Sequence, residues 1–192
     1  MKPALFTIGH STHPTEDFLA LLHQHGITAL CDVRSAPYSR YNPQFKKEPL
    51  AASLKEADVA YVYLGRELGA HVHDPAFHEN GRVSYAKVAR ADFFRAGLER
   101  VREGMKSYRV ALMCAERDPI VCHRFMLVTR NLRGEGFAIV HVCADGSLET
   151  NEDAERRLLE AARLPRGTLF DDEAAMIEAA YERMGKGMAA NS

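Results

Sequence analysis

The sequence of 192 residues contains no tryptophan, only four cysteines and no long run of apolar residues. A membrane helix needs about 18 or more consecutive apolar residues, so the sequence argues against a membrane span. The formal net charge of -1 excludes a general electrostatic preference for nucleic acid or acidic membranes. Any bound anion must therefore be held by a local arrangement of residues, and nucleic acid is not indicated as a partner.

The first residues, MKPALFTIGHSTH, contain one lysine and a short apolar run that glycine and histidine interrupt. This pattern indicates a first strand rather than a secretory signal peptide. Cysteines in a chain without such a signal are typical of a reducing compartment, where thiols stay free. We therefore expect a cytoplasmic protein with unpaired cysteines.

The sequence does contain a regular alternation of apolar runs and amphipathic segments. The apolar runs predict five strands, at residues 4–11, 27–35, 59–65, 109–116 and 137–143. The amphipathic segments predict helices at about residues 15–25, 49–57, 84–108, 122–136 and 151–164. This order predicts a single three-layer α/β domain over residues 1–164, with a mostly parallel five-stranded sheet flanked by helices. Residues 165–192 are predicted to form a C-terminal helical extension or a partly disordered tail.

Polar residues follow three of the predicted strands at their carboxyl ends. His10 and Ser11 follow the first strand, Asp32 and Arg34 the second, and Cys114 with Glu116 the fourth. Ligands of open parallel sheets bind at this edge. The helix predicted to begin with Cys122, His123 and Arg124 would present the amide groups of its N-terminus to the same edge. The sequence therefore predicts a functional site there.

Several blocks of the sequence resemble a known family. TIGHSTH, DVRSAPYSR with the following NPQF, and ALMCAERDPIVCHR resemble the signature blocks of the domain-of-unknown-function 488 family. The resemblance extends over residues 7–159 and includes DGSLETNEDAERRLL. It implies a compact α/β protein, and the family's name assigns no activity.

Cys114 and Cys122 allow three interpretations. A cysteine at a helix N-terminus beside His123 and Arg124 would have a lowered pKa, which favours a reactive thiolate with a second thiol nearby. The spacing is not that of a CxxC pair, and an adjacent cysteine and histidine are expected to point apart along a helix, so no metal ligands are predicted. In the third interpretation both cysteines only fill space, and Glu116 forms a structural ion pair with Arg124.

The arginines and histidines elsewhere in these motifs have binding and structural interpretations. Arg34 and Arg40 can bind a phosphate or carboxylate in a bidentate manner, or pair with Asp32. His10 can act as a base or bond to the backbone locally. The histidines at 71, 73 and 78 are interpreted as solvated or locally bonded rather than as metal ligands.

The leading hypothesis is an enzyme that binds an anionic, phosphate-containing or nucleotide-like substrate. The predicted catalytic residues are Cys114, Cys122, Glu116, Asp32 and His10. The predicted ligand-binding residues are Arg34, Arg40, Ser11, His123 and Arg124. The alternatives are a non-catalytic module that binds a nucleotide or nucleic acid, and a metal-binding protein that uses cysteine and histidine. The sequence assigns neither a cofactor nor an oligomeric state.

Overall fold

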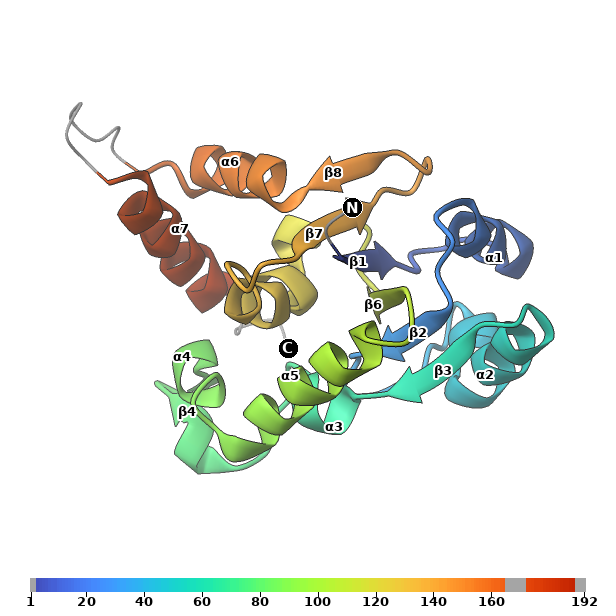
Figure 1. The fold of residues 1–192 in the computed structure, drawn as a ribbon. Helices are drawn as coiled ribbons and strands as arrows, with labels where there is room; N and C mark the ends of the chain where they lie inside the picture. The colour runs from blue at the N-terminus through green and yellow to red at the C-terminus, as the bar shows by residue number, and fades with distance from the viewer. Residues whose placement is uncertain (1–2, 165–171, 189–192) are drawn as a thin grey trace.

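The computed structural model of the chain describes residues 3–164 and 172–188. Its centre is a six-stranded sheet with the strand order β3-β2-β6-β1-β7-β8 (Figure 1). The strands are β1 (Ala4–Gly9), β2 (Ala29–Asp32), β3 (Ala60–Tyr63), β6 (Val110–Cys114), β7 (Ala138–Val142) and β8 (Leu148–Thr150). The first five are parallel to their neighbours, and β8 is antiparallel to β7. The predicted α/β fold with a mostly parallel sheet is confirmed, with one strand more than the predicted five.

Helices cover both faces of this sheet. On one face, side chains of α1 (Thr15–Gln24) and α2 (Lys47–Glu56) join a buried cluster. The cluster on the other face includes residues of α3 (Gly65–Leu68), α4 (Tyr85–Val88), α5 (Asp92–Met105), α6 (Asn151–Ala162) and α7 (Glu173–Met188). A small hairpin of β4 (His78–Glu79) and β5 (Arg82–Val83) stands apart from the main sheet. Adjacent residues of one strand alternate between the faces, so that Leu112 belongs to one cluster and Met113 to the other.

The chain leaves the neighbouring central strands β1 and β6 toward opposite faces of the sheet. Helix α1 follows β1 and packs through Phe18 into one cluster, whereas the segment after β6 packs through Phe125 and Leu127 into the other. In open parallel sheets, ligands bind in the crevice at such a topological switch point. The carboxyl ends of β1 and β6 are therefore where the architecture itself favours a site.

The helix predicted over residues 84–108 is broken into α4 and α5. Ala91 has an extended backbone, with φ -73° and ψ 144°, and separates the two helices. The break allows both Val88 and Phe94 to be buried. On one continuous helix, six residues correspond to a rotation of about 600°, which would leave these side chains about 120° apart. Residues 89–91 contain neither proline nor glycine, so the sequence does not mark the break.

The segment after β6 is not the single helix predicted over residues 122–136. It consists of the 3-10 turn η3 (Pro119–Val121), the π-helical turn η4 (Arg124–Val128) and the 3-10 turn η5 (Thr129–Asn131). Gly134 and Gly136 follow with φ values of 79° and 87°, which glycine adopts readily. All five residues of η4 are buried, and π turns are frequent beside functional sites.

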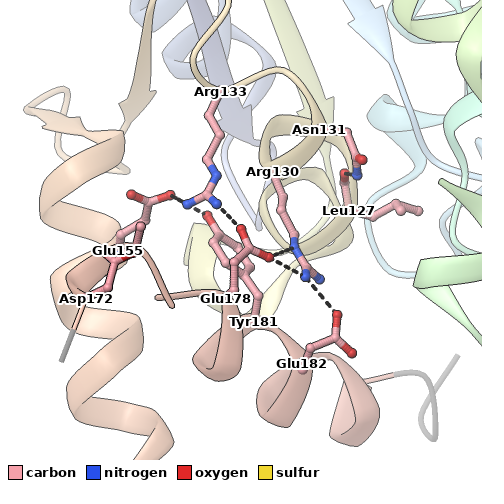
Figure 2. Close-up of polar contacts among 10 residues, drawn as sticks. Leu127, Arg130, Asn131, Arg133, Glu155, Asp172, Glu178, Tyr181 and Glu182 are labelled. Atoms are coloured by element: carbon pink, nitrogen blue, oxygen red, sulfur yellow. Dashed lines mark hydrogen bonds and ion pairs between the residues drawn. The ribbon is translucent and has the colours of Figure 1, made fainter. Parts of the chain in front are cut away.

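Helix α7 is fixed against the segment that follows the site (Figure 2). Arg130 forms ion pairs with Glu178 at 2.6 Å and with Glu182 at 2.7 Å. The fully buried Tyr181 donates a hydrogen bond to Glu155 of α6 at 3.0 Å. These contacts give α7 a defined position beside η5 and α6.

The division into a domain over residues 1–164 and an extension over residues 165–192 stays a prediction. Helix α7 lies within the second range, while residues 165–171 and 189–192 lie outside the described residues. Within residues 3–164 and 172–188, no helix has both the length and the apolar character needed to cross a bilayer.

Candidate functional site

The turn after β6 lies directly against the end of β1. The register places Gly9 beside Cys114, and the backbone amide of His10 donates to the Cys114 carbonyl at 2.9 Å. A Cβ atom on Gly9 would lie 1.9 Å from the carbonyl oxygen of Glu116. Only glycine therefore allows the turn that carries Glu116 to approach β1 so closely. From the sequence, Gly9 could be identified only as the end of a strand.

Four side chains from this turn and from the start of the next segment converge on one point. Ligand-type atoms of Cys114, Glu116, Cys122 and His123 all lie within 4.8 Å of one another. Cys114 Sγ is 3.4 Å from His123 Nδ1, and Cys122 Sγ is 3.0 Å from Glu116 Oε2. We call these four residues the cysteine–histidine cluster. All four were predicted site residues, and the structure brings them together.

Cys122 and His123 point toward the same place, so the prediction that they point apart along a helix was wrong. Cys122 Sγ lies 4.0 Å from His123 Nδ1. Cys122 precedes the helical segment and has an extended backbone, with φ -129° and ψ 142°, whereas His123 already has helical angles. The rotation of about 100° between adjacent residues of an α-helix therefore does not separate them. His123 Nε2 donates to the Val33 carbonyl at 2.9 Å, which turns Nδ1 toward the sulfur atoms.

The environment moves the pKa values of the two cysteines in opposite directions. Burial raises the pKa of Cys114 well above its ordinary value, and its interactions with Cys122 add to this effect. Burial also favours the neutral thiol of Cys122, but the hydrogen bond with Cys114 and the positive charges of Arg124 and His123 lower its pKa well below the ordinary value. Cys122 is therefore the sulfur that loses its proton first.

The other two members of the cluster respond to the same negative charge. Burial and the charge on Cys122 raise the pKa of Glu116. Burial opposes a charge on His123, but the hydrogen bond and the charge of Cys122 outweigh it and raise the pKa of this histidine. Both shifts follow in part from the negative charge that Cys122 carries when it is deprotonated.

Arg124 is fully buried behind the cluster. Its Nη1 donates to the carbonyl of Glu116 at 2.6 Å and its Nη2 to the carbonyl of Arg117 at 3.1 Å, while Nε contacts the Thr7 hydroxyl at 3.3 Å. Its backbone amide donates to Cys122 Sγ at 3.4 Å. The guanidinium therefore holds the backbone of the turn, and not the Glu116 carboxylate as the structural interpretation expected. Its predicted role in anion binding stays a prediction.

A second hydrogen-bonded group, at the end of β2, adjoins the cluster. Arg34 binds the buried Asp32 through Nε at 2.9 Å and Nη2 at 2.6 Å, and Nη2 also donates to the Phe45 carbonyl at 2.8 Å. Its Nη1 donates to His10 Nε2 at 3.1 Å, which leaves one hydrogen of Nη1 without a partner among the described residues. The Tyr61 hydroxyl donates to Asp32 at 2.9 Å. Asp32 therefore orients Arg34 rather than facing a ligand.

Both ring nitrogens of His10 are occupied. Nδ1 lies 2.9 Å from the Ser11 carbonyl, Nε2 accepts from Arg34, and the ring stacks on Phe45 with the centroids 4.2 Å apart. Burial and the charge of Arg34 lower the pKa of His10 to about 4. In this arrangement the neutral imidazole positions Arg34 and offers no free nitrogen as a base.

A pocket of about 840 Å³ opens at this edge of the sheet. Of the predicted site residues, it is lined by His10, Ser11, Arg34, Cys114, Glu116 and His123. The lining does not include three buried site residues, Asp32, Cys122 and Arg124, or the exposed Arg40. The pocket also includes residues that sequence reasoning missed, among them Ser35, Ser39 and Asn42 of the loop after β2, and Arg183 and Met184 of α7.

The histidine-rich stretch contributes little to the pocket. His71 lines it, whereas His73 and His78 do not. His78 Nε2 lies 2.6 Å from the Val72 carbonyl, which agrees with the interpretation of a locally bonded histidine. Metal-type clusters in the described part of the chain are limited to the cysteine–histidine cluster.

Fold and site together define an α/β protein with a cysteine–histidine cluster, buried except for Glu116, at the switch point of a mostly parallel sheet. The chain belongs to the family described as "Domain of unknown function DUF488", which matches residues 14–130. The matched range includes all four residues of the cluster, and the resemblance noted in the sequence is confirmed. Neither the curated proteins nor the solved structures provide a match to the chain.

Proposed function

We propose that the protein is an enzyme that acts on a small anionic, phosphate-containing or nucleotide-like substrate in the pocket at the carboxyl edge of the sheet. One observation carries this proposal: a single pocket joins the cysteine–histidine cluster to a wall of basic side chains. Pockets of about 300–1,000 Å³ suit small-molecule ligands, and the volume here lies within that range. A cytoplasmic location is part of the proposal, because four free cysteines need a reducing compartment.

The basic character of the lining supports an anionic substrate. Two arginines and three histidines line the pocket, namely Arg34, Arg183, His10, His71 and His123, and His10 among them is neutral. The hydrogen of Arg34 Nη1 that has no partner among the described residues is a donor held at a fixed position by Asp32. Arginine forms strong, charge-assisted hydrogen bonds with phosphate. Arg183 of α7 would add a second positive charge to the lining.

The cluster supplies the groups that can carry a reaction. Cys114, Glu116 and His123 line the pocket, and Cys122 lies directly behind them. Sulfur, imidazole and carboxyl groups at these distances can attack a substrate and exchange protons with it. Ser11, whose amide is bonded to the Ala115 carbonyl at 2.9 Å, also lines the pocket. His10 and Asp32 act through Arg34 as positioning residues.

The binding step can be tested with inorganic phosphate and nucleoside monophosphates titrated into the full chain by calorimetry. Arg183→Ala should weaken binding by about tenfold, which corresponds to about 1.4 kcal/mol and to one charged hydrogen bond. Arg156→Ala removes an exposed arginine of α6 outside the pocket and is the matched control. Equal affinities of both variants and the wild type would contradict the proposed pocket.

The catalytic step can be tested by following the bound compounds by phosphorus NMR. Cys114→Ser should abolish turnover, whereas Cys143→Ser, which changes a free cysteine outside the pocket, should leave it unchanged. Turnover that persists in Cys114→Ser would remove the cluster from the reaction. A compound that binds and is never converted would favour the alternative of a non-catalytic binding module.

A further inference from the structure

The geometry points to a site for one divalent transition-metal ion, best matched by Zn²⁺, with Cys114, Cys122 and His123 as ligands and Glu116 as the fourth. The ion would be the cofactor of the reaction in the pocket, and in that respect the inference rests on the proposed function. The ion would sit at the centre of the cysteine–histidine cluster, whose four side chains already converge. Thiolate and imidazole ligands together favour zinc or iron over magnesium or calcium.

Three of the six distances between the ligand atoms lie near those of a tetrahedral site. Zinc binds sulfur at about 2.3 Å and nitrogen or oxygen at about 2.0–2.2 Å, so a sulfur atom and a nitrogen or oxygen atom of one tetrahedron lie about 3.5–3.7 Å apart. The measured separations are 3.4 Å and 4.0 Å from His123 Nδ1 to the sulfurs of Cys114 and Cys122, and 3.0 Å from Cys122 Sγ to Glu116 Oε2. Each needs to change by about 0.6 Å or less to fit a tetrahedron of these bond lengths.

His123 is oriented as a ligand by a contact outside the cluster. Its Nε2 lies 2.9 Å from the Val33 carbonyl, which can only accept, so the proton of the neutral ring is on Nε2. The lone pair of Nδ1 then points toward the two sulfur atoms. A hydrogen bond from the second ring nitrogen to a carbonyl is the usual way in which proteins orient a metal-bound histidine.

The buried charge of Arg124 is compatible with a bound metal ion. Its guanidinium is fully buried, and among the described residues it forms no ion pair with a carboxylate; its side chain bonds to two carbonyls and to a hydroxyl. A buried charge is stabilised by a negative charge nearby. Two thiolates, one carboxylate and a divalent cation together carry a net charge of -1, which would balance Arg124. The Arg124 amide also donates to Cys122 Sγ, a contact suited to a metal-bound thiolate.

The fourth ligand lies on the pocket side of the site. Cys114, Glu116 and His123 all line the pocket, and Glu116 is the one exposed residue of the four. Catalytic zinc sites keep one position open to water or substrate, and the exposed Glu116 is the ligand that a substrate could displace. A metal held in this way would be accessible to a phosphate oxygen of a bound substrate, because the pocket reaches the cluster.

The inference can be tested with metal alone. The full chain, purified in the reduced form and freed of metal by a chelator, is titrated with Co²⁺, which reports sulfur ligands by a charge-transfer absorption in the near ultraviolet. We expect one bound equivalent, this absorption, and its loss when Zn²⁺ is added. Cys114→Ser and Cys122→Ser should each lower the affinity at least about tenfold, since each removes a direct ligand. Cys143→Ser, which removes a thiol outside the cluster, should bind as the wild type does.

The wild-type titration decides the inference even where a variant fails to fold. A folded, reduced wild-type chain that binds less than one equivalent of Co²⁺, or binds it without the sulfur absorption, overturns the site. Turnover of a phosphate compound at an unchanged rate by the metal-free chain would also overturn it, while leaving the proposed function intact. One equivalent of sulfur-bound Co²⁺ in a chain that binds no phosphate compound would support the metal site and remove only the proposed function.

Discussion

The close approach of β1 to the turn that carries Glu116 makes Gly9→Ala the substitution with the clearest structural consequence. The new Cβ would lie 1.9 Å from the Glu116 carbonyl oxygen and 2.8 Å from its carbonyl carbon. Both are backbone atoms, so no side chain can rotate away. The strand end and the turn would have to separate by about 1.5 Å to reach the ordinary contact distance of 3.4 Å.

The cost of this separation can be worked out from the contacts that it breaks. The Glu116 carbonyl accepts from Arg124 Nη1 at 2.6 Å, and the buried guanidinium has little room to follow it. Overpacking costs about 1–3 kcal/mol, and an unsatisfied buried donor costs about 1–3 kcal/mol. We expect the free energy of unfolding to fall by about 2–6 kcal/mol in total, together with a loss of metal affinity, because Glu116 moves away from Cys122.

Urea denaturation followed by circular dichroism measures this effect. Gly104→Ala is the matched control, since its Cβ would meet only Val110 at an ordinary distance of 3.7 Å. There the change should be neutral or stabilise α5 by up to about 1 kcal/mol. An unfolding free energy of Gly9→Ala within about 0.5 kcal/mol of the wild type would refute the reasoning, because surface substitutions without structural consequence lie in that range.

Two further predictions concern buried polar groups next to the site. Tyr61→Phe removes the hydroxyl that donates to Asp32 at 2.9 Å. Urea denaturation should show a free energy of unfolding about 1 kcal/mol lower than that of the wild type, and the free energy of unfolding of Tyr63→Phe is measured for comparison. Burial lowers the pKa of His141 to about 3 from its ordinary value of 6.5. The unfolded chain therefore binds this proton first as the pH falls, and stability should decrease between pH 6.5 and pH 3 by up to about 4–5 kcal/mol. In His141→Gln, urea titrations across this range should show a weaker pH dependence; an unchanged pH dependence would count against a neutral, buried His141.

The fold could be predicted largely because the central strands β1, β2 and β6 are buried along almost their whole length. The run Val110–Cys114 is apolar without interruption, which is typical of a strand in a parallel sheet. Strand β8 was missed because it has only three residues and is partly exposed, so no apolar run marks it. The break between α4 and α5 was missed because tertiary packing of Val88 and Phe94, and not a helix-breaking residue, produces it.

The place of the site could be predicted, but not the partners of its residues. The carboxyl ends of neighbouring parallel strands meet at one edge, which is a property of the sheet and follows from the strand order. Whether a charged residue faces a ligand or another part of the chain depends on packing. Arg34 meets Asp32 and His10, and Arg124 meets the carbonyl of Glu116, contacts that no spacing in the sequence indicates.

The orientation of Cys122 and His123 also depends on structure that sequence patterns do not encode. Helical periodicity separates adjacent residues, but it applies only inside the helix, and Cys122 lies before η4 with an extended backbone. The same change of backbone conformation turns both side chains toward Cys114. A boundary error of one residue in a predicted helix was therefore enough to hide the convergence of the cluster.

Both proposals depend on the convergence of sulfur, imidazole and carboxylate groups beneath the pocket. X-ray absorption at the zinc edge of the full chain loaded with one equivalent of Zn²⁺ measures this most directly. We expect two sulfur ligands at about 2.3 Å and two nitrogen or oxygen ligands at about 2.0–2.2 Å. A first shell made only of nitrogen and oxygen atoms would contradict it, because the metal would then be bound elsewhere than between Cys114 and Cys122.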